Sequence, residues 1–447
     1  MKLVLLGGGG FRTPAMFRAV ASGATSVRYD EIVLYDTDET RLRRIGDVIA
    51  DMRSTMSAST TVTLTTRLDQ ALDGADVIYC AIRVGGVPAR VIDETVAIES
   101  GAIGQETAGA GGIGYALRTV PVMTRLALEV QRLAPNALFI NFTNPVGLVT
   151  EALRRVLGDR VIGICDTPEE LCRRSAEAAG YRPQDVWFDY FGINHLGWLK
   201  GMRVGNRDVL PDLIVDTQRL MSFEEGRLFG PEWIQANGII PNEYLFYYYN
   251  QREALNAMRR GTPRSQYLEQ TQRTFYENSS GRPGEALAEW ERTLAEREAN
   301  YMTEAWDGRA DDQEKVIAAR QTGGYGRLAL GVVDALNSDG NQVMILDVPN
   351  RSALPFLDED AIVEVSCVVN RGGITPTAVG SVPLEARGLI QQVRGAERIA
   401  IDAALSGSRS QAIRALALHP LVPSVSAAQT IFDGYMHGQP TLREIFS

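Results

Sequence analysis

The stretch KLVLLGGGGFR, residues 2–12, decides the fold. Its first five residues are typical of a short buried strand, and the glycines after them let the chain turn tightly into a helix expected over 13–22. Glycines at such a turn allow the backbone to approach a pyrophosphate, and the amides at the helix N-terminus point toward that anion. The stretch therefore predicts a Rossmann-type dinucleotide site. Its expected members are Gly7, Gly8, Gly9, Gly10, Phe11 and Arg12.

A carboxylate at the end of the second expected strand, over 31–35, supports this interpretation. Arg12 stands where the usual fingerprint has its third glycine, so the turn alone is an incomplete match. Asp36 follows the second strand, where a carboxylate accepts hydrogen bonds from both ribose hydroxyls and repels a 2′-phosphate. We therefore expect NAD rather than NADP. The alternative is a tight turn that binds no ligand.

Strand-like and helical segments alternate over residues 1–190, which is typical of a doubly wound parallel sheet. Further strands are expected at 62–65, 76–81, 137–141 and 160–164, with helices between them, among them one over 39–56 and a short one at 70–72. We expect residues 1–190 to form an α/β NAD-binding domain of the Rossmann type.

The pattern changes after about residue 190, where polar and aromatic residues become more frequent. The segment 205–320 is expected to be mostly helical, strand-like runs follow within 340–385, and helices are expected over 387–406 and 425–437. Residues 191–447 are therefore expected to form a second, mixed α+β domain for catalysis, substrate binding and oligomerisation. A ligand would lie at the carboxyl ends of the parallel strands, facing this domain.

Composition excludes several classes of protein. The chain has 447 residues, 45% of them hydrophobic and 22% charged, and a formal net charge of −10, which argues against nucleic-acid or anionic-membrane partners. The apolar run at the N-terminus stops at Leu6, and no later apolar run is long enough to cross a membrane. Four cysteines without dense spacing do not indicate a disulfide framework. A cytoplasmic protein is expected.

Two motifs offer ligands for a metal. Cys165 follows a strand-like run within GICDTP, and His195 lies in GINHLGW after another such run. A thiolate and an imidazole with open positions for substrate oxygens would suit a divalent transition metal. A buried structural cysteine and histidine are the alternative. His419 and His437 lie in no motif and are expected to be surface or helix-end residues.

Seven blocks of sequence follow one another in order along the chain: the GGGG turn, RVGGVPARVIDE (83–94), GQETAGAGG (104–112), NFTNP (141–145), GICDTP, GINHLGW and IPNEYLFYYY (240–249). Together they resemble glycoside hydrolase family four, a family of NAD- and manganese-dependent glycosidases. The resemblance covers residues 2 to about 437, and the layout is nearest to the 6-phospho-β-glucosidases of that family.

The resemblance implies hydrolysis through oxidation, elimination, water addition and re-reduction, with NAD and a divalent metal, expected to be manganese, as cofactors. It implies that Cys165 and His195 hold the metal and that Tyr244 is the base that removes a proton from the sugar. Three further tyrosines at 247–249 leave the register of that base open. The implied partner is a small phosphorylated sugar, and the implied assembly is a homodimer or homotetramer.

The resemblance also assigns residues to the ligands. Arg83 is assigned to the cofactor, and Arg90 and Arg264 are assigned to the sugar 6-phosphate, for which the fork of an arginine provides paired, charge-assisted bonds. Glu106 and Asn144 are assigned to sugar hydroxyls. A helix N-terminal charge and a simple turn residue are the alternatives for these last two.

One residue departs from the β-specific pattern. Asp166 follows Cys165, where many β-specific members carry asparagine and α-specific members carry aspartate in a proposed acid role. Asp166 could protonate the leaving oxygen or stiffen the metal loop. A 6-phospho-α-glucosidase, or a member acting on galactosides or uronides, therefore stays open. A metal-assisted NAD-dependent dehydrogenase and a non-catalytic sensor of NAD or sugar are more distant alternatives.

Overall fold

The structure is a computed structural model, and it describes residues 1–447 except 24, 57–59, 278–283, 307–308, 310 and 315–323. The first strand, β1 (Lys2–Leu6), lies between β2 (Glu31–Tyr35) and β4 (Val77–Cys80) and pairs with both in parallel. Three more strands continue this parallel arrangement: β3 (Thr61–Thr65), β5 (Leu138–Asn141) and β6 (Val161–Gly163). The order β3-β2-β1-β4-β5-β6 is that of the dinucleotide-binding fold, whose ligands bind where the order reverses, beside β1 and β4.

Both faces of this sheet are buried, which explains why its central strands are almost wholly apolar. Leu3 and Leu5 of β1 face one hydrophobic cluster, and Val4 and Leu6 face another. The first cluster contains residues of α1 (Thr13–Ala21), α2 (Glu39–Thr55) and α17 (Gly324–Leu336), and the second contains residues of α3 (Leu68–Leu72), α5 (Gly109–Leu133) and α6 (Val146–Leu157). The expected α/β class with a doubly wound parallel sheet is confirmed.

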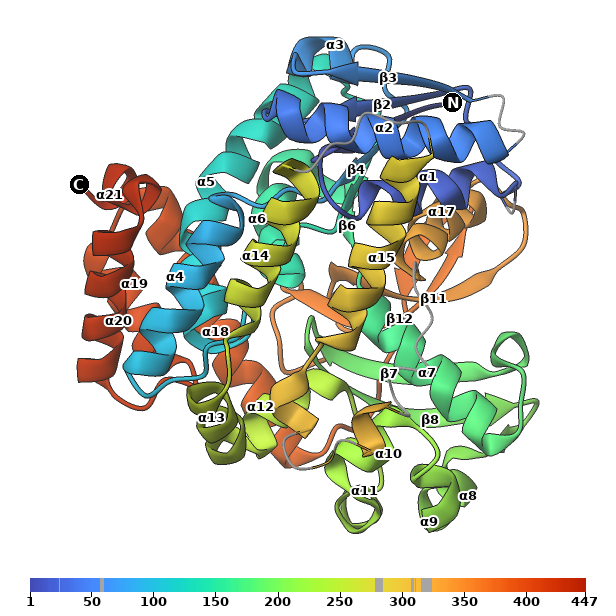
Figure 1. Cartoon of the computed structure of the whole chain (residues 1–447). Helices are drawn as coiled ribbons and strands as arrows, with labels where there is room; N and C mark the ends of the chain where they lie inside the picture. Colours follow the sequence, from blue (N-terminus) through green and yellow to red (C-terminus); the bar gives the residue numbers. More distant parts are fainter. Residues whose placement is uncertain (24, 57–59, 278–283, 307–308, 310, 315–323) are drawn as a thin grey trace.

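The helices of the first part of the chain follow the strands in the expected alternation (Figure 1). Their bounds are α1 (Thr13–Ala21), α2 (Glu39–Thr55), α3 (Leu68–Leu72), α4 (Gly86–Glu99), α5 (Gly109–Leu133), α6 (Val146–Leu157) and α7 (Asp166–Ala179), with short 3₁₀ turns η1 (Gly158–Arg160) and η2 (Pro183–Asp185).

Strands from the last third of the chain extend the same sheet. β11 (Gln342–Pro349) pairs antiparallel with β6 through Asp347 and Gly163, and β12 (Ile362–Asn370) and β13 (Gly373–Pro376) continue outward. The described residues thus form a nine-stranded sheet to which both halves of the chain contribute.

A second, antiparallel sheet lies beside this edge. Its strands are β7 (Trp187–Ile193), β8 (Leu196–Val204), β9 (Arg207–Asp208) and β10 (Ile240–Pro241). β7 packs against β12, where the Ser366 hydroxyl accepts from the Tyr190 N–H at 3.2 Å and donates to the Phe188 carbonyl at 2.7 Å. The two sheets are therefore joined by direct hydrogen bonds.

The remaining helices cover the second sheet and enclose the region between the two halves. Their bounds are α8 (Leu210–Val215), α9 (Thr217–Leu220), α10 (Glu224–Phe229), α11 (Pro231–Asn237), η3 (Glu243–Leu245), α12 (Phe246–Tyr249), α13 (Gln251–Arg260), α14 (Arg264–Glu277), α15 (Glu285–Ala299), η4 (Thr303–Trp306), α17 (Gly324–Leu336), α18 (Leu384–Ser406), α19 (Arg409–Leu418), α20 (Val425–Gly438) and α21 (Pro440–Phe446).

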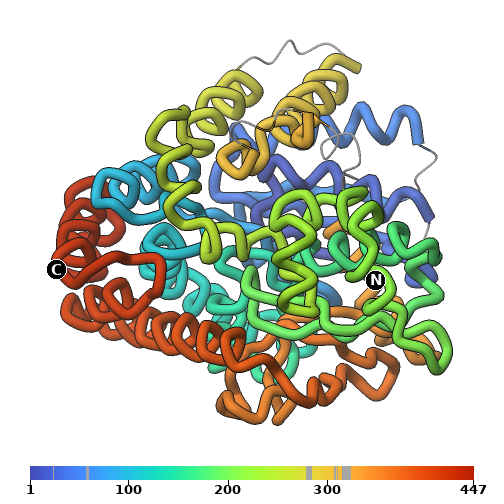
Figure 2. Tube along the Cα trace, turned by 90° about the horizontal axis from the view of Figure 1, so that it is seen from below, coloured from blue at the N-terminus to red at the C-terminus, as the bar shows by residue number. Residues whose placement is uncertain are grey.

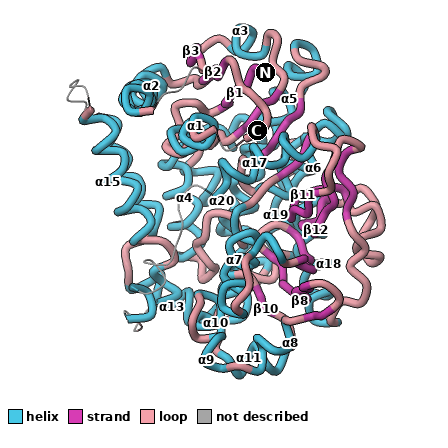
Figure 3. Tube along the Cα trace, turned by 90° about the vertical axis from the view of Figure 1, so that its right-hand side faces the viewer, coloured by secondary structure: helices cyan, strands magenta, loops and turns pink. Residues whose placement is uncertain are grey.

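Two groups of these helices return to the N-terminal half. The C-terminal helices, red in Figure 2, pack beside α4 and α5 around a cluster rich in alanine. In Figure 3, α15 runs along the left-hand edge of the molecule, and in Figures 1 and 3 its upper end lies near α2; α14 contacts both α2 and α4. Within the described part of the chain, no helix is both long and apolar enough to span a membrane.

Candidate active site

The glycine turn after β1 is packed too closely for side chains. The Gly7 and Gly8 amides donate to the Tyr35 carbonyl at 2.9 and 2.7 Å, and Gly7 has a φ of +90°. A Cβ on Gly8 would lie 2.7 Å from the Leu34 Cβ. The Asp36 carboxylate accepts from the Gly9 amide at 3.0 Å, so the turn and the end of β2 form one unit. Asp36 thus lies beside the turn, as the ribose-binding interpretation requires.

Helices α14 and α15 close over this turn. The Tyr276 hydroxyl donates to the Gly9 carbonyl at 2.8 Å, and the Trp290 indole donates to the Phe11 carbonyl at 2.9 Å. The Phe11 ring packs against Trp290 and is buried, so this residue can offer a cofactor only its backbone. The Arg297 guanidinium lies 4.5 Å from the centre of the Phe11 ring. Sequence reasoning missed Tyr276, Trp290 and Arg297, because they lie more than 260 residues from the turn and in no motif.

Arg12 lies at the boundary between the turn and the site. Its guanidinium is 4.9 Å from the centre of the Phe142 ring and 5.1 Å from that of Tyr325. Asp166, the first residue of α7, is close enough for its charge to act on Arg12. Burial raises the pKa of the Asp166 carboxyl, and the Arg12 charge opposes this shift.

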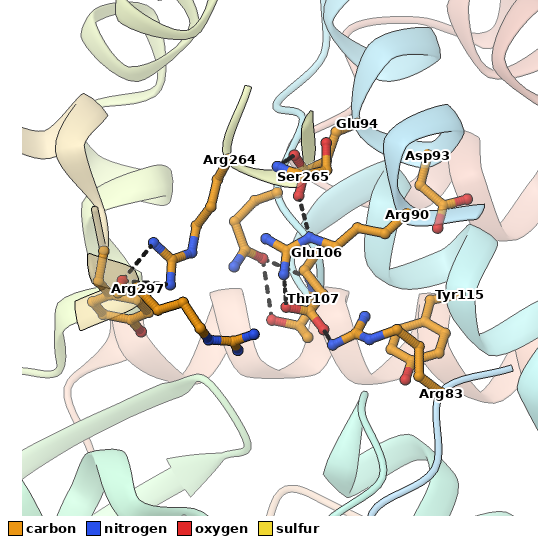
Figure 4. Close-up of polar contacts among 12 residues, drawn as sticks. Arg83, Arg90, Asp93, Glu94, Glu106, Thr107, Tyr115, Arg264, Ser265 and Arg297 are labelled. Atoms are coloured by element: carbon orange, nitrogen blue, oxygen red, sulfur yellow. Dashed lines mark hydrogen bonds and ion pairs between the residues drawn. The ribbon is translucent and has the colours of Figure 1, made fainter. Parts of the chain in front are cut away.

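Glu106 lies at the centre of a network of arginines (Figure 4). It accepts hydrogen bonds from Arg83 and from Arg90, the latter at 2.5 Å. Burial alone would raise the pKa of Glu106, but the charges of Arg83 and Arg90 outweigh it and hold that pKa well below its usual range. Arg90 also donates to Glu94 at 2.6 Å. Two carboxylates therefore balance the charge of Arg90.

Arg264 has different surroundings. It begins α14, lies 4.9 Å from the centre of the Tyr301 ring, and donates to the backbone carbonyls of Arg297 and Asn300. Burial and the neighbouring Arg90 lower the pKa of Arg264. Burial, Arg264 and Arg12 lower the pKa of Arg297 to about 9. In the described ranges neither Arg264 nor Arg297 forms an ion pair with a carboxylate, which leaves positive charge available to an anion.

Arg90, Glu106 and Arg264 line a cavity of about 320 Å³. It lies between α4, α13, α14 and the turn before α5. Its lining includes Arg90, Gln105, Glu106, Tyr244, Arg264 and Tyr301. The cavity brings together the residues that the sequence assigned to sugar and phosphate, except Asn144. The buried Asn144 Oδ1 has no hydrogen-bond partner among the residues that the structure describes.

The two expected metal ligands lie at the ends of strands. Cys165 follows β6 and precedes the first residue of α7. His195 lies in the two-residue turn between β7 and β8 with a φ of +61°, a backbone conformation that is rare outside glycine. Both are buried, at 5% and 7% exposure. Burial lowers the pKa of His195 to about 3, so its ring is neutral and can offer a lone pair.

Tyr244 lies against His195 and near Cys165. Its ring stacks on His195 with the centres 3.7 Å apart and the planes 5° apart. Burial raises the pKa of the Tyr244 phenol, and negative charge on Glu243 and on the nearby Cys165 raises it further. Tyr301 donates its one hydroxyl proton to Glu243 at 2.9 Å, and the Tyr301 oxygen lies 2.9 Å from the Tyr244 hydroxyl.

The other tyrosines of the block have partners elsewhere. Tyr247 donates to Glu304 at 2.5 Å, and Tyr249 accepts from the Trp198 indole at 3.1 Å. Tyr248 lies against His419, with the ring centres 6.2 Å apart. Of the four tyrosines, Tyr244 is the one that stacks on His195, which favours it as the base.

A metal at this place would be held by few protein ligands. Among the described residues, no group of three or more His, Cys, Asp or Glu side chains could hold a metal ion. The sulfur of Cys165 and a ring nitrogen of His195 nevertheless fit a divalent transition metal, whose other positions would be filled by oxygens of substrate or water.

The remaining cysteines and histidines lie outside the site. Cys80 is buried in β4, 3.4 Å from the Thr143 hydroxyl, and Cys172 is buried in α7, as packing residues would be. His437 is exposed in the last turn of α20. His419 ends α19 as expected, but it is buried rather than on the surface, and its Nδ1 accepts from the Leu421 amide at 3.2 Å.

The chain is similar to known proteins over nearly its whole length. The family model described as "Family 4 glycosyl hydrolase" matches residues 2–179, and the model of the C-terminal domain of that family matches residues 190–422. A Bacillus subtilis protein named "Probable 6-phospho-beta-glucosidase" is 30% identical over 447 residues, which covers 97% of this chain and 95% of the relative.

Two solved structures share the whole fold. The 6-phospho-beta glucosidase from Thermotoga maritima, solved with manganese, NAD+ and glucose-6-phosphate, superposes with a TM-score of 0.81 at 25% identity and covers 98% of both chains. A 6-phospho-alpha-glucosidase from gut microorganisms, solved with NAD and glucose-6-phosphate, gives a TM-score of 0.80 at 26% identity, over 98% of this chain and 97% of that one.

Proposed function

The chain belongs to family 4 of the glycosyl hydrolases, and on that basis we propose that it hydrolyses 6-phospho-β-glucosides with NAD and a divalent metal. The observation that carries the proposal is the convergence of Cys165, His195 and Tyr244 beside a cavity that also holds Arg264. The glycine turn with Asp36 supports NAD, and the sulfur and nitrogen donors support the metal.

The bound cofactors would supply chemistry that side chains lack. NAD permits reversible oxidation of a sugar hydroxyl, and a divalent cation adds positive charge beside the resulting carbonyl oxygen. A carbonyl makes the proton on the neighbouring carbon acidic, so that proton can be removed and the aglycone can leave by elimination.

The side chains of this protein would bind and orient the sugar and move protons. Tyr244 would accept the proton from the carbon beside the carbonyl; because burial raises the pKa of its phenol, it needs a cation nearby to act as a base. Asn144 and Glu106 would contact sugar hydroxyls. Arg264 would attract the 6-phosphate. The positive charge of Arg297, which lies near Arg264, would add to this attraction.

A second candidate, hydrolysis of 6-phospho-α-glucosides, is favoured by one observation. Burial raises the pKa of Asp166, which suits a proton donor to a leaving oxygen. Relatives of both specificities are found, and the 30% identical one carries the β name. We therefore place the β-glucosidase first.

Product analysis tests the proposal. The enzyme would be incubated with 6-phospho-cellobiose or 6-phospho-maltose in the presence of NAD, Mn²⁺ and a thiol reductant. We expect glucose and glucose 6-phosphate from 6-phospho-cellobiose. Preferential cleavage of 6-phospho-maltose would contradict the β assignment, and steady accumulation of NADH without cleavage would contradict a glycosidase.

We further propose that the protein is cytoplasmic and forms a homodimer or a homotetramer.

A further inference from the structure

The turn between α4 and α5 holds a hydrogen-bonded chain that ends on His195. The Gln105 side-chain oxygen accepts from the backbone amides of Thr107 and Ala108 at 2.6 and 2.7 Å. Backbone amides only donate, so these two bonds fix which end of the Gln105 amide faces them. That oxygen is therefore an acceptor for every other group within reach.

The Thr107 hydroxyl is the next link. It lies 3.1 Å from the Gln105 side-chain oxygen and 2.7 Å from the His195 Nδ1. A hydroxyl has one proton, and the Gln105 oxygen can only accept, so the Thr107 proton points to Gln105. If it pointed to His195 instead, lone pairs of Thr107 and Gln105 would face each other. The Thr107 oxygen therefore accepts a hydrogen bond, and its donor is the Nδ1–H of His195.

We propose that Gln105 and Thr107 are positioning residues that hold His195 as the Nδ1–H tautomer, which leaves the lone pair of Nε2 for a divalent cation. The proposal rests on the metal site of the proposed function. In metalloproteins the second ring nitrogen of a histidine ligand commonly donates to such a partner, which fixes the tautomer and the ring orientation.

The backbone keeps this chain rigid. A Cβ on Gly111 would lie 2.1 Å from the Gln105 carbonyl oxygen, and one on Gly112 would lie 2.3 Å from the Thr107 carbonyl oxygen. These glycines let the turn rest directly on the first turn of α5. On the other side, the Tyr244 ring stacks on His195 and limits its rotation. Figure 4 shows Thr107 beside Glu106, so the same turn serves the sugar network and the histidine.

The tautomer can be measured without any metal or substrate. The chain has three histidines, so the metal-free protein labelled with ¹⁵N-histidine gives few imidazole signals, and His195→Gln identifies those of His195. We expect the wild type and Thr107→Ser to show the Nδ1–H form at His195. We expect Thr107→Val, which has the same shape without the hydroxyl, to lose this preference. The Nε2–H form in the wild type would overturn the proposal.

Metal affinity gives the second readout. From the electron paramagnetic resonance of free Mn²⁺, we expect Thr107→Val to raise the dissociation constant about 10–100-fold, and Thr107→Ser to stay near the wild-type value. Circular dichroism and NAD affinity control for folding. An unchanged Mn²⁺ affinity of Thr107→Val would overturn the positioning role. If Cys165→Ser also binds Mn²⁺ as the wild type does, the proposed metal site is wrong. The tautomer of His195, measured without metal, then still tests whether Gln105 and Thr107 form the hydrogen-bonded chain.

Discussion

The two arginines assigned to the substrate phosphate differ in the charges around them. Arg90 is held between Glu94 and Glu106, so its charge is already balanced and its side chain also fixes Glu106. Arg264 contacts backbone carbonyls and a tyrosine ring instead. An unbalanced, buried guanidinium attracts an anion more strongly than a paired one does. Arg264 is therefore the better place to test for phosphate recognition.

We predict that Arg264→Ala lowers kcat/KM on a 6-phosphorylated glycoside by about 1.5 to 3.5 decades. A buried arginine–phosphate contact contributes roughly 2–5 kcal/mol, at about 1.4 kcal/mol per decade. Part of this energy positions the sugar, so kcat should fall as well as affinity. Steady-state kinetics on phosphorylated and unphosphorylated substrates would measure this. The exposed Arg252→Ala serves as the control; equal losses on both substrates would exclude a phosphate contact.

Asp166 offers a second test, which asks whether this residue protonates the leaving oxygen. If it protonates the leaving oxygen, Asp166→Asn should lower kcat by about 10²–10⁴-fold on substrates with poor leaving groups, and much less on aryl glycosides, whose leaving groups need no proton. If it only supports the loop that carries Cys165, both substrate classes should change together. Because its pKa is raised by burial, we predict the first result. Kinetics on a series of aryl and alkyl glycosides would distinguish the two.

The strands and helices of the Rossmann half follow from their local sequence patterns. β1, the glycine turn and Asp36 lie within 35 residues and act on one another directly, so the sequence contains enough to predict them. The sequence does not predict that α14 and α15 close over that turn. This closure depends on hydrogen bonds from Tyr276 and Trp290 to backbone carbonyls near the N-terminus, more than 260 residues away. The joining of β11 to β6 likewise depends on pairing across about 180 residues.

The site shows the same division. Cys165, His195 and Tyr244 lie in motifs and could be named from the sequence, but nothing in the motifs shows that Tyr244 stacks on His195. The balance of charge around Arg90 also depends on side chains from separate elements. The residues that carry the chemistry can thus be predicted from the sequence. The side chains that they contact become known only from the folded structure.

The glycine turn after β1 leaves no room for a side chain at Gly9. A Cβ on Gly9 would lie 2.9 Å from the Asp36 Oδ2 and 3.0 Å from the Leu42 amide nitrogen, so Gly9→Ala must push the turn away from the end of β2. Overpacking of this kind costs about 1–3 kcal/mol. We predict that the dissociation constant for NAD, measured by calorimetry, rises about tenfold or more.

Gly388 provides the control for this substitution. A Cβ there meets nothing within 4 Å, and the residue lies in α18, far from the turn in the sequence. Gly388→Ala should leave NAD binding unchanged and, because alanine favours helices, stabilise the protein by up to about 1 kcal/mol. An unchanged NAD affinity of Gly9→Ala would show that the turn does not bind the dinucleotide.

A buried neutral histidine makes the free energy of unfolding of the whole protein depend on pH. Burial lowers the pKa of His419 from 6.5 to about 3. Between these values the unfolded chain binds one proton more than the folded one, so stability falls as the pH falls. The loss should be about 2 kcal/mol between pH 7 and pH 5.

His419→Asn isolates this contribution, because the asparagine oxygen can replace Nδ1 as the acceptor of the Leu421 amide. We predict that this variant loses about 2 kcal/mol less than the wild type over the same pH range. Urea unfolding at the two pH values measures the difference. Equal losses in both proteins would show that His419 is protonated in the folded state or is not buried.

The fate of NAD and of one sugar proton separates a glycosidase from a dehydrogenase that shares the Rossmann half. In a glycosidase that oxidises and then re-reduces its sugar, NAD is regenerated in each turnover, and the proton beside the carbonyl exchanges with solvent. We predict that hydrolysis of a 6-phosphorylated glycoside in deuterated water places deuterium at the second sugar carbon, while no NADH accumulates. Nuclear magnetic resonance of the product and absorbance at the NADH band measure the two quantities. Tyr244→Phe should slow the exchange and leave NAD affinity intact, because Tyr244 contacts His195 and Tyr301 rather than the glycine turn. Net NADH formation in step with substrate loss would assign the chain to dehydrogenase chemistry, and cleavage without deuterium would indicate direct displacement at the first sugar carbon, which two carboxylates can perform without NAD.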